Sequence, residues 1–521
     1  MTEPTPADAT STDASRARAT RVPPAFHVPE TAARRWRLRS LEPSTDVAAT
    51  VYAADRLILS GWTGQRSVEV DELATLAGSA GVELTVTALG AARSIGGRVE
   101  LAERLGAGAQ SVVEIRSEGP DAPDAWVLLQ RARAARLGVA SRLSLCHVLM
   151  AAGYVSGVGY VSGVGYVSGV GYVSGVGYVS GVGYVSGVGG SGPGAPAGRV
   201  PVAWPGGPPT DDSARWAPTV AILDTGLGEH PWFEQNVTRD PQFAGAPIGL
   251  RVPPEDDPEV SGVTLDRVNW LLDPMAGHGT FIAGIVRAAC PSAHIVSVPV
   301  MHGDGACDEA DLIAALTDLH ARHLLSLDGQ GSEPPLDVVN LSMGYYHESP
   351  DTVSDEAGLM AALAALSSSG VTVVAGAGNG GSDVEFWPAA AAAAPDGAPI
   401  VSVGSANPGT QEVVSHFSNT GPWVRTYRAG AGVVSTMPTT FDAATQASQL
   451  ASGPVHPRRG TADLDDFSGG FGLWSGTSFS APKLAGELAA ALARGKRPSS
   501  VTDRCSLSRS LVEKLCADEG P

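Results

Sequence analysis

Gly472-Leu-Trp-Ser-Gly-Thr-Ser-Phe-Ser-Ala-Pro482 is the stretch of sequence that decides the fold. Small residues around Ser478 allow a strand to turn sharply into a helix, which leaves the serine hydroxyl beside a backbone N–H at the positive end of that helix. The segment from Lys483 to Arg494 is rich in Ala and Leu and is predicted to form this helix. Glycine and serine also crowd ordinary turns and helix caps, so the stretch alone assigns no chemistry.

Short apolar strands alternate with helical segments over residues 215–497. Strands are predicted at 220–223, 295–300, 338–342, 371–375 and 400–404, and helices at 280–289, 310–325 and 358–367. Continuous apolar strands separated by helices predict an α/β fold, with a doubly wound, mostly parallel sheet that carries helices on both faces. Functional residues of such sheets lie at the carboxyl ends of the strands.

Four polar residues follow strands or begin helices in this region. Asp224 ends the first strand, His278 opens a helix, Asn379 lies on a glycine-rich loop after the strand 371–375, and Ser478 precedes the last helix. Each alone is typical of a turn, a cap or a satisfied core residue. Their occurrence together, in the order Asp, His, Asn, Ser, indicates a common site.

Five motifs carry a resemblance to a known family. Asp224-Thr-Gly, His278-Gly-Thr-Phe-Ile-Ala-Gly, Asn340-Leu-Ser-Met-Gly, Gly378-Asn-Gly and Gly476-Thr-Ser-Phe-Ser-Ala-Pro resemble those of the subtilisin-like serine peptidases, over roughly residues 216–494. The resemblance implies a serine endopeptidase that hydrolyses peptide bonds through an acyl-enzyme. Asp224, His278 and Ser478 would form the catalytic triad, and Asn379 would lie in the oxyanion hole.

The same resemblance implies residues that bind a polypeptide substrate. Leu341, Ser342, Met343 and Gly344 would pair with an extended peptide backbone, and Gly376, Ala377 and Gly378 would form the opposite wall of the primary specificity pocket. Tyr345 and Tyr346 follow where the family usually has a small residue, so we expect these aromatic side chains to narrow the cleft. Residues 439–470 form a polar insertion before the serine motif, which we expect to be an exposed loop.

The part of the chain before residue 215 divides into three segments. Residues 1–45 are predicted to be disordered, 46–150 to form a small α/β domain, and 151–214 to be a linker that contains six tandem Tyr-Val-Ser-Gly-Val-Gly units; residues 498–521 are expected to be a C-terminal tail. By position, the small domain resembles the inhibitory propeptides of the family. A regulatory or partner-sensing domain is the alternative.

Two other functions stay open at the level of the sequence. One is a transpeptidase or cyclase that transfers the acyl-enzyme to an amine. The other is a scaffold that self-associates through the hexapeptide repeat and carries a latent protease domain. Product mass separates the first from hydrolysis, and deletion of residues 154–189 tests the second.

Composition limits the partners and the compartment. The 521 residues include 35 basic and 54 acidic side chains, a formal net charge of −19, which argues against a nucleic acid or an anionic membrane as partner. Five cysteines form no CxxC pair, so we expect no structural zinc site and no metal at the predicted site. No cofactor is required; relatives bind calcium, but no calcium ligands are identified. We find no secretion signal and expect a cytoplasmic location, with export by a route not visible in the sequence as the alternative.

Overall fold

A computed structural model describes most of the chain. The described residues are 28–44, 47–61, 67–93, 99–117, 122–152, 199–204, 206–211, 213–268, 270–350, 353, 357–443, 450–451, 459–460 and 467–517. The hexapeptide repeat, and with it the proposed self-association, lies outside these residues. Most of the insertion at 439–470 lies outside them as well.

An antiparallel sheet forms the N-terminal part of the described chain. Its strands are β1 (Leu38–Leu41), β2 (Thr50–Ser60), β3 (Val82–Ala88), β4 (Gln110–Ser117) and β5 (Leu143–Ala151), in the order β5-β2-β4-β3 with β1 beside β2. Helices α3 (Val68–Gly78) and α5 (Ala125–Ala134) pack on it, and α4 (Val99–Leu105) follows β3. Ser67 and Asp124 cap α3 and α5 through their side chains. We call Leu38–Ala152 the N-terminal unit.

Residues 28–41 differ from the disorder expected for residues 1–45. They include helix α2 (Glu30–Arg35) and strand β1. Ala32, with Trp36 beside it, packs against Met150 and Ala306, and Arg35 forms an ion pair with Asp304 at 3.0 Å. Ala32 is thus buried and Trp36 half-buried by contacts with distant residues, which local composition does not reveal.

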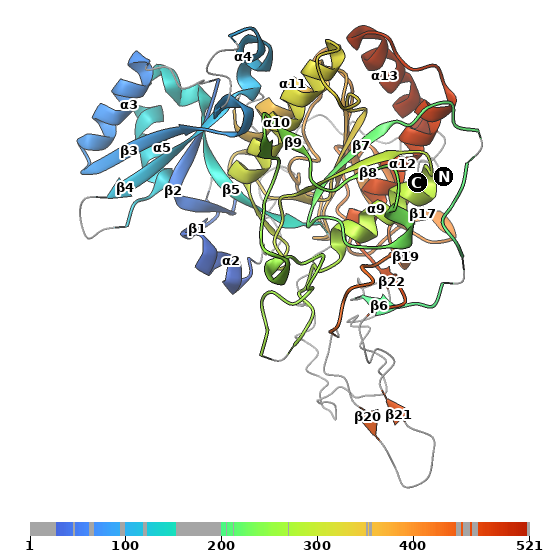
Figure 1. The fold of residues 1–521 in the computed structure, drawn as a ribbon. Coiled ribbons are helices and arrows are strands. Elements are labelled where there is room, and N and C mark those ends of the chain that lie inside the picture. The colour runs from blue at the N-terminus through green and yellow to red at the C-terminus, as the bar shows by residue number, and fades with distance from the viewer. Residues whose placement is uncertain are drawn as a thin grey trace, which may run out of the picture.

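The predicted parallel sheet is present in the C-terminal part of the chain (Figure 1). Its order is β17-β16-β15-β13-β7-β11-β8, with β18 beside β16. The strands are β7 (Thr219–Asp224), β8 (Val237–Thr238), β11 (His294–Pro299), β13 (Val338–Leu341), β15 (Thr372–Gly376), β16 (Ile400–Asn407), β17 (Thr410–Val414) and β18 (Thr426–Ala429). Every pairing is parallel except that between β16 and β17. The α/β fold class is therefore confirmed.

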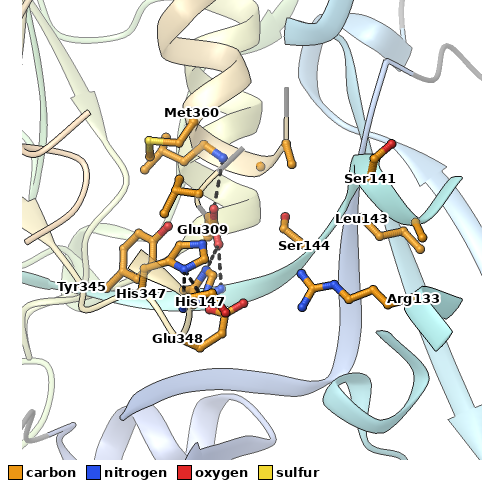
Figure 2. A pocket seen from close by; sticks show the side chains of 16 residues that line it. Arg133, Ser141, Leu143, Ser144, His147, Glu309, Tyr345, His347, Glu348 and Met360 are labelled. Carbon is orange, nitrogen blue, oxygen red and sulfur yellow. Dashed lines mark hydrogen bonds and ion pairs between the residues drawn. The ribbon is translucent and has the colours of Figure 1, made fainter. Parts of the chain in front are cut away.

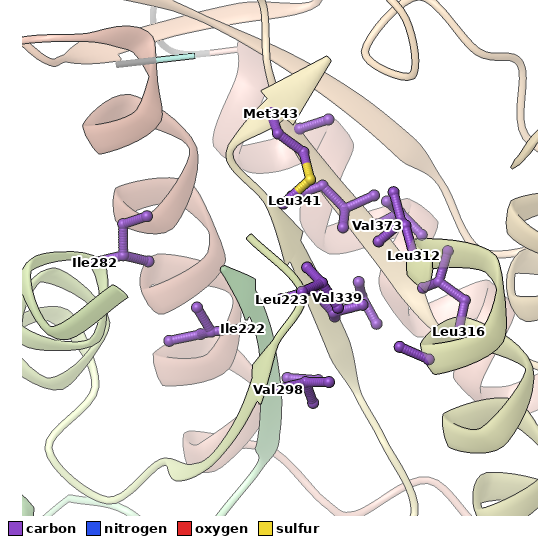
Figure 3. Close-up of a cluster of buried hydrophobic side chains, with 14 of the residues drawn as sticks. Ile222, Leu223, Ile282, Val298, Leu312, Leu316, Val339, Leu341, Met343 and Val373 are labelled. Carbon is purple, nitrogen blue, oxygen red and sulfur yellow. The ribbon is translucent and has the colours of Figure 1, made fainter. Parts of the chain in front are cut away.

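Helices cover both faces of this sheet. They are α9 (His278–Ala289), α10 (Glu309–Leu327), α11 (Gly358–Ser368) and α12 (Thr477–Arg494). Figure 3 shows Ile282 of α9 on one side of the strands, and Leu312 and Leu316 of α10 on the other. The strand side chains between them are fully buried, as their continuous apolar character predicts.

Strand β5 joins the N-terminal unit to the C-terminal part. It pairs antiparallel with β12 (Ala306–Asp308) through Met150 and its neighbours, and with β14 (Met343–Gly344) through Ala151. Figure 1 shows this cyan strand running from the N-terminal sheet into the C-terminal part. The last residues of β5 are therefore held between two short strands of the C-terminal part.

The C-terminal tail expected at 498–521 instead contains helix α13 (Val501–Ala517), which packs against α12. Its buried Arg504 bonds Asp337 at 2.9 Å, so this segment is anchored to the sheet. Smaller strands complete the description: β6 (Val200–Pro201), β9 (Gln242–Phe243), β10 (Ala246–Pro247), β19 (Val433–Thr436), β20 (Leu450–Ala451), β21 (Arg459–Gly460) and β22 (Phe471–Trp474). Among the described helices, none has the length and apolar character needed to cross a bilayer.

Candidate active site

Asp224 and His278 meet at the carboxyl edge of the parallel sheet. Asp224 is the last residue of β7 and His278 the first of α9. His278 Nδ1 lies 2.7 Å from Asp224 Oδ1, and both side chains are fully buried. Gly279 permits this approach, because a Cβ there would lie only 2.2 Å from the carbonyl oxygen of Gly226. The aspartate therefore orients the imidazole and favours the tautomer with a proton on Nδ1.

Ser478 is the second residue of α12 and belongs to the same edge. Its Oγ donates to the carbonyl oxygen of Ser342 at 3.2 Å. His278 Nε2, the ring nitrogen that faces away from Asp224, has no hydrogen-bond partner among the described residues. The bond between serine and imidazole is thus not formed in this arrangement, and such bonds often form only with a bound substrate.

Asn379 presents its amide to a backbone carbonyl. Its Oδ1 accepts a hydrogen bond from Thr477 N at 2.9 Å, which leaves Nδ2 free to donate. Nδ2 donates to the carbonyl oxygen of Ala152, and Thr477 Oγ1 lies 3.4 Å from that same oxygen. Two donors from different elements therefore converge on one peptide carbonyl, beside Ser478.

The end of the N-terminal unit lies in the cleft where a peptide substrate was expected. Ala152 N donates to Ser342 O at 2.8 Å, and Ala151 N donates to Gly305 O at 2.8 Å. Of the four residues predicted to pair with a peptide, Ser342, Met343 and Gly344 pair with β5 or Ala152. Leu341 does not, because it lies in the central strand β13, between β7 and β15.

The other predicted wall of the pocket lies beside Ala152. A Cβ on Gly376 would lie 3.3 Å from the Ala152 Cβ, so a larger residue at 376 would crowd this position. Ala377 O accepts from Asn419 Nδ2 at 2.9 Å, and Gly378 N donates to Thr477 Oγ1 at 3.0 Å. Ala377 and Gly378 thus bond to Asn419 and Thr477, which lie beside the predicted pocket.

The two tyrosines predicted to narrow the cleft have different positions. Tyr346 packs with Val384 and Phe386 around Ala152, the position at which it was expected to narrow the cleft. Tyr345 is turned away and stacks on His147 of β5, with ring centroids 4.2 Å apart. Only the second tyrosine fits the expectation.

Glu259 is a site residue that the sequence analysis missed. Its carboxylate accepts from the hydroxyls of Thr225 and Thr280 and, at 3.0 Å, from Gly279 N. Burial raises its pKa to about 8. It connects the strand that ends in Asp224 to the helix that begins at His278, and thereby fixes their relative position. It lies in an acidic loop, and no local pattern distinguishes it from the solvated carboxylates nearby.

The family model described as the subtilase family matches residues 216–514. Subtilisin-like protease 2 of Pseudogymnoascus destructans is 28% identical over 214 residues, 40% of this chain and 46% of that protein. The chain thus spans about half the length of this curated relative.

Two solved structures are also similar. A cold-adapted subtilisin-like serine proteinase is 22% identical, with 57% of this chain and 82% of that chain covered and a TM-score of 0.35. A lanthipeptide protease is 21% identical, with 56% and 78% covered and a TM-score of 0.36. Because the family model covers more than half of the sequence, the chain belongs to the subtilase family, a family of serine-type peptidases.

Proposed function

We propose that this chain is a serine endopeptidase that uses Asp224, His278 and Ser478 as its triad, and that the N-terminal unit inhibits it until the chain cuts itself. The observation that carries the proposal is the carbonyl of Ala152, which accepts hydrogen bonds beside Ser478 as a scissile carbonyl would. A peptide in this position has its acyl side bound and its carbonyl polarised.

The reaction follows from the positions of the three side chains. Ser478 Oγ leaves its bond to Ser342 O, gives its proton to His278 Nε2 and attacks the carbonyl carbon. The unpartnered Nε2 is free to accept this proton. Asp224 stabilises the resulting imidazolium through its 2.7 Å contact to Nδ1.

The tetrahedral intermediate needs donors for its negative oxygen. Asn379 Nδ2 supplies one, and its orientation is held by the bond from Thr477 N. When the intermediate collapses, the C–N bond breaks and His278 gives its proton to the leaving amine. Water then hydrolyses the acyl-enzyme by the same route. In these steps the chain supplies the nucleophile, the base and the oxyanion donor, and water is the second reactant.

The bond cut in self-processing would be Ala152–Gly153. Ala152 is the residue whose carbonyl meets Asn379, and its N–H and that of Ala151 are paired as those of an extended substrate. The same contacts support inhibition, since a second peptide cannot occupy the cleft while β5 fills it. This position lies at the start of the linker 151–214, directly after the small domain predicted at 46–150.

Intact-mass measurement and N-terminal sequencing of the purified protein test both parts. The wild-type chain should yield a fragment that begins at Gly153, and the Ser478→Ala variant should stay at full length. Asn379→Ala should slow the conversion while it leaves the cleavage position unchanged. A wild-type chain that hydrolyses peptides but is never cut after Ala152 would refute the propeptide role. A folded wild-type chain that neither cuts itself nor reacts with a fluorophosphonate would refute the peptidase.

A further inference from the structure

Two imidazoles and two carboxylates meet at the junction between the N-terminal unit and the C-terminal part. His147 comes from β5, Glu309 is the first residue of α10, and His347 and Glu348 follow β14. His147 Nδ1 lies 2.7 Å from Glu309 Oε2, and His147 Nε2 lies 2.8 Å from Glu348 Oε2. Figure 2 shows both carboxylates reaching this one imidazole. The proposed peptidase chemistry uses none of these four residues.

Three of these residues have the geometry of a metal site. One ligand atom from each of His147, His347 and Glu348 lies within 4.8 Å of the other two. His347 Nδ1 is 3.4 Å from Glu348 Oε2. Zinc bonds of about 2.0–2.1 Å in a tetrahedron place neighbouring ligand atoms about 3.3 Å apart. The His347–Glu348 pair already has this spacing, and the His147–Glu348 pair reaches it by opening about 0.5 Å.

The cluster contains two buried carboxylates whose negative charge a cation can neutralise. Glu309 and Glu348 are each 1% exposed, and neither forms an ion pair with Arg or Lys in the described part of the chain. His347 Nδ1 accepts a bond from Ser349 N at 3.0 Å, so that nitrogen carries no proton. A proton on His147 therefore offsets one of two buried negative charges. A divalent cation between neutral imidazoles offsets both, which buried carboxylates require.

Glu309 has the position of an orienting partner rather than a ligand. It accepts from His147 Nδ1 and also from the backbone N of His147 at 2.7 Å. Metal-bound histidines are commonly held in this way, with one nitrogen on a carboxylate and the other on the metal. The bond to Glu309 thus directs the Nε2 lone pair of His147 toward Glu348.

A cavity of about 460 Å³ adjoins the cluster. His147, Glu309, His347 and Glu348 all line it, and Arg133 lines it from the N-terminal unit (Figure 2). The volume of this cavity is sufficient for an ion and its bound water. Imidazole ligands favour zinc and similar transition metals over calcium or magnesium, which prefer oxygen.

We propose that His147, His347 and Glu348 bind a zinc-class divalent cation, with water at the fourth position, and that this cation fastens β5 to the C-terminal part. At Nε2 of His147 the cation takes the place of the proton shared with Glu348. At Nδ1 of His347 it takes the place of the Ser349 contact. The site joins the two sides of the proposed cleavage junction, so it holds the inhibitory strand in the cleft.

Zinc binding to the full-length Ser478→Ala variant tests this proposal without any need for catalysis. The metal-free protein competes with a chromophoric chelator for Zn²⁺, and one ion should bind per chain. His347→Ala and Glu348→Gln should each weaken binding at least tenfold, and Glu309→Gln should weaken it 10- to 100-fold as an orienting residue. Replacement of the exposed His416 by Ala, far from the cluster in sequence, is the matched control and should change nothing.

Two further readouts separate a bound metal from a folding defect. Co²⁺ in place of Zn²⁺ should give a visible ligand-field spectrum that Glu348→Gln alters. Zn²⁺ should also raise the Tm of Ser478→Ala, and His347→Ala should abolish this rise without lowering the Tm of the metal-free protein. Zinc binding that is absent, or equally tight in all three cluster variants and the parent, would overturn the proposal. Neither result would bear on whether Ser478 is a nucleophile.

Discussion

Replacement of Gly279 by Ala tests how closely the site depends on the packing of α9 against β7. The added Cβ would lie 2.2 Å from the carbonyl oxygen of Gly226 and 3.0 Å from its nitrogen. To restore an ordinary van der Waals distance, α9 and the Gly226 segment must move apart by about 1 Å. The blocking atoms belong to the backbone, so no side-chain rotation can relieve the clash. His278 directly precedes Gly279, and Asp224 lies two residues before Gly226. A shift between these two backbone segments therefore displaces His278 from Asp224 and disturbs their 2.7 Å contact.

A displacement of 1 Å in a catalytic arrangement costs about 100-fold in rate, or about 3 kcal/mol of activation free energy. We therefore expect Gly279→Ala to lower kcat/KM for a short chromogenic peptide about 100-fold. Overpacking should also lower the free energy of unfolding by about 1–3 kcal/mol. Active sites are counted by fluorophosphonate titration, and stability is measured by urea unfolding in the Ser478→Ala background.

Gly207→Ala serves as the control, because a Cβ there meets no atom of the described residues within 4 Å. It should keep both the activity and the stability of the parent. Gly279→Ala with kcat/KM within threefold of the parent would refute the reasoning, since the helix would then have moved without cost to the Asp–His contact.

Three further predictions concern stability, pH and specificity. Arg504→Met should lower the free energy of unfolding by about 3–5 kcal/mol in urea titrations, because Asp337 stays buried without its partner; a loss below about 1 kcal/mol would contradict this. Burial lowers the pKa of His320 to about 4, so between the unfolded value of about 6.5 and pH 4 the unfolded chain binds the proton more strongly. As the pH is lowered from about 6.5 to about 4, the free energy of unfolding should therefore fall by about 3 kcal/mol. The His320→Leu variant should lose less stability over the same pH range. Tyr346→Ala should favour peptides with Phe over Ala before the cleaved bond at least tenfold in kcat/KM; an unchanged ratio would place the pocket elsewhere.

Much of the C-terminal part could be predicted from sequence because its signals are local. Asp224 follows the four apolar residues 220–223 of its strand, and His278 follows a glycine that permits a helix start. Such patterns report directly on strand ends and helix starts, where the chain brings polar groups to one edge of the sheet. The helix predicted at 358–367 also matches the structure, where α11 spans Gly358–Ser368.

The features that could not be predicted depend on contacts between distant segments. Cys146 and His147 carry no motif, and their neighbours Asp308, Glu309 and Glu348 are more than 150 residues away. Glu259 is buried by two threonines from separate motifs. Ala32 becomes buried, with the half-buried Trp36 packed beside it, only because β12 and the end of β5 meet there. A single sequence records the side chain in each case but not the partner that buries it.

The short lengths of β12 and β14 have a consequence for the chain once β5 is absent. Their two edges then expose unpaired backbone groups, which in a long strand would invite association with other chains. With only three and two residues respectively, these edges are too short to support an extended intermolecular sheet. They are still long enough to pair with the backbone of a few peptide residues on both sides. Strand length thus reconciles an open recognition surface with resistance to aggregation.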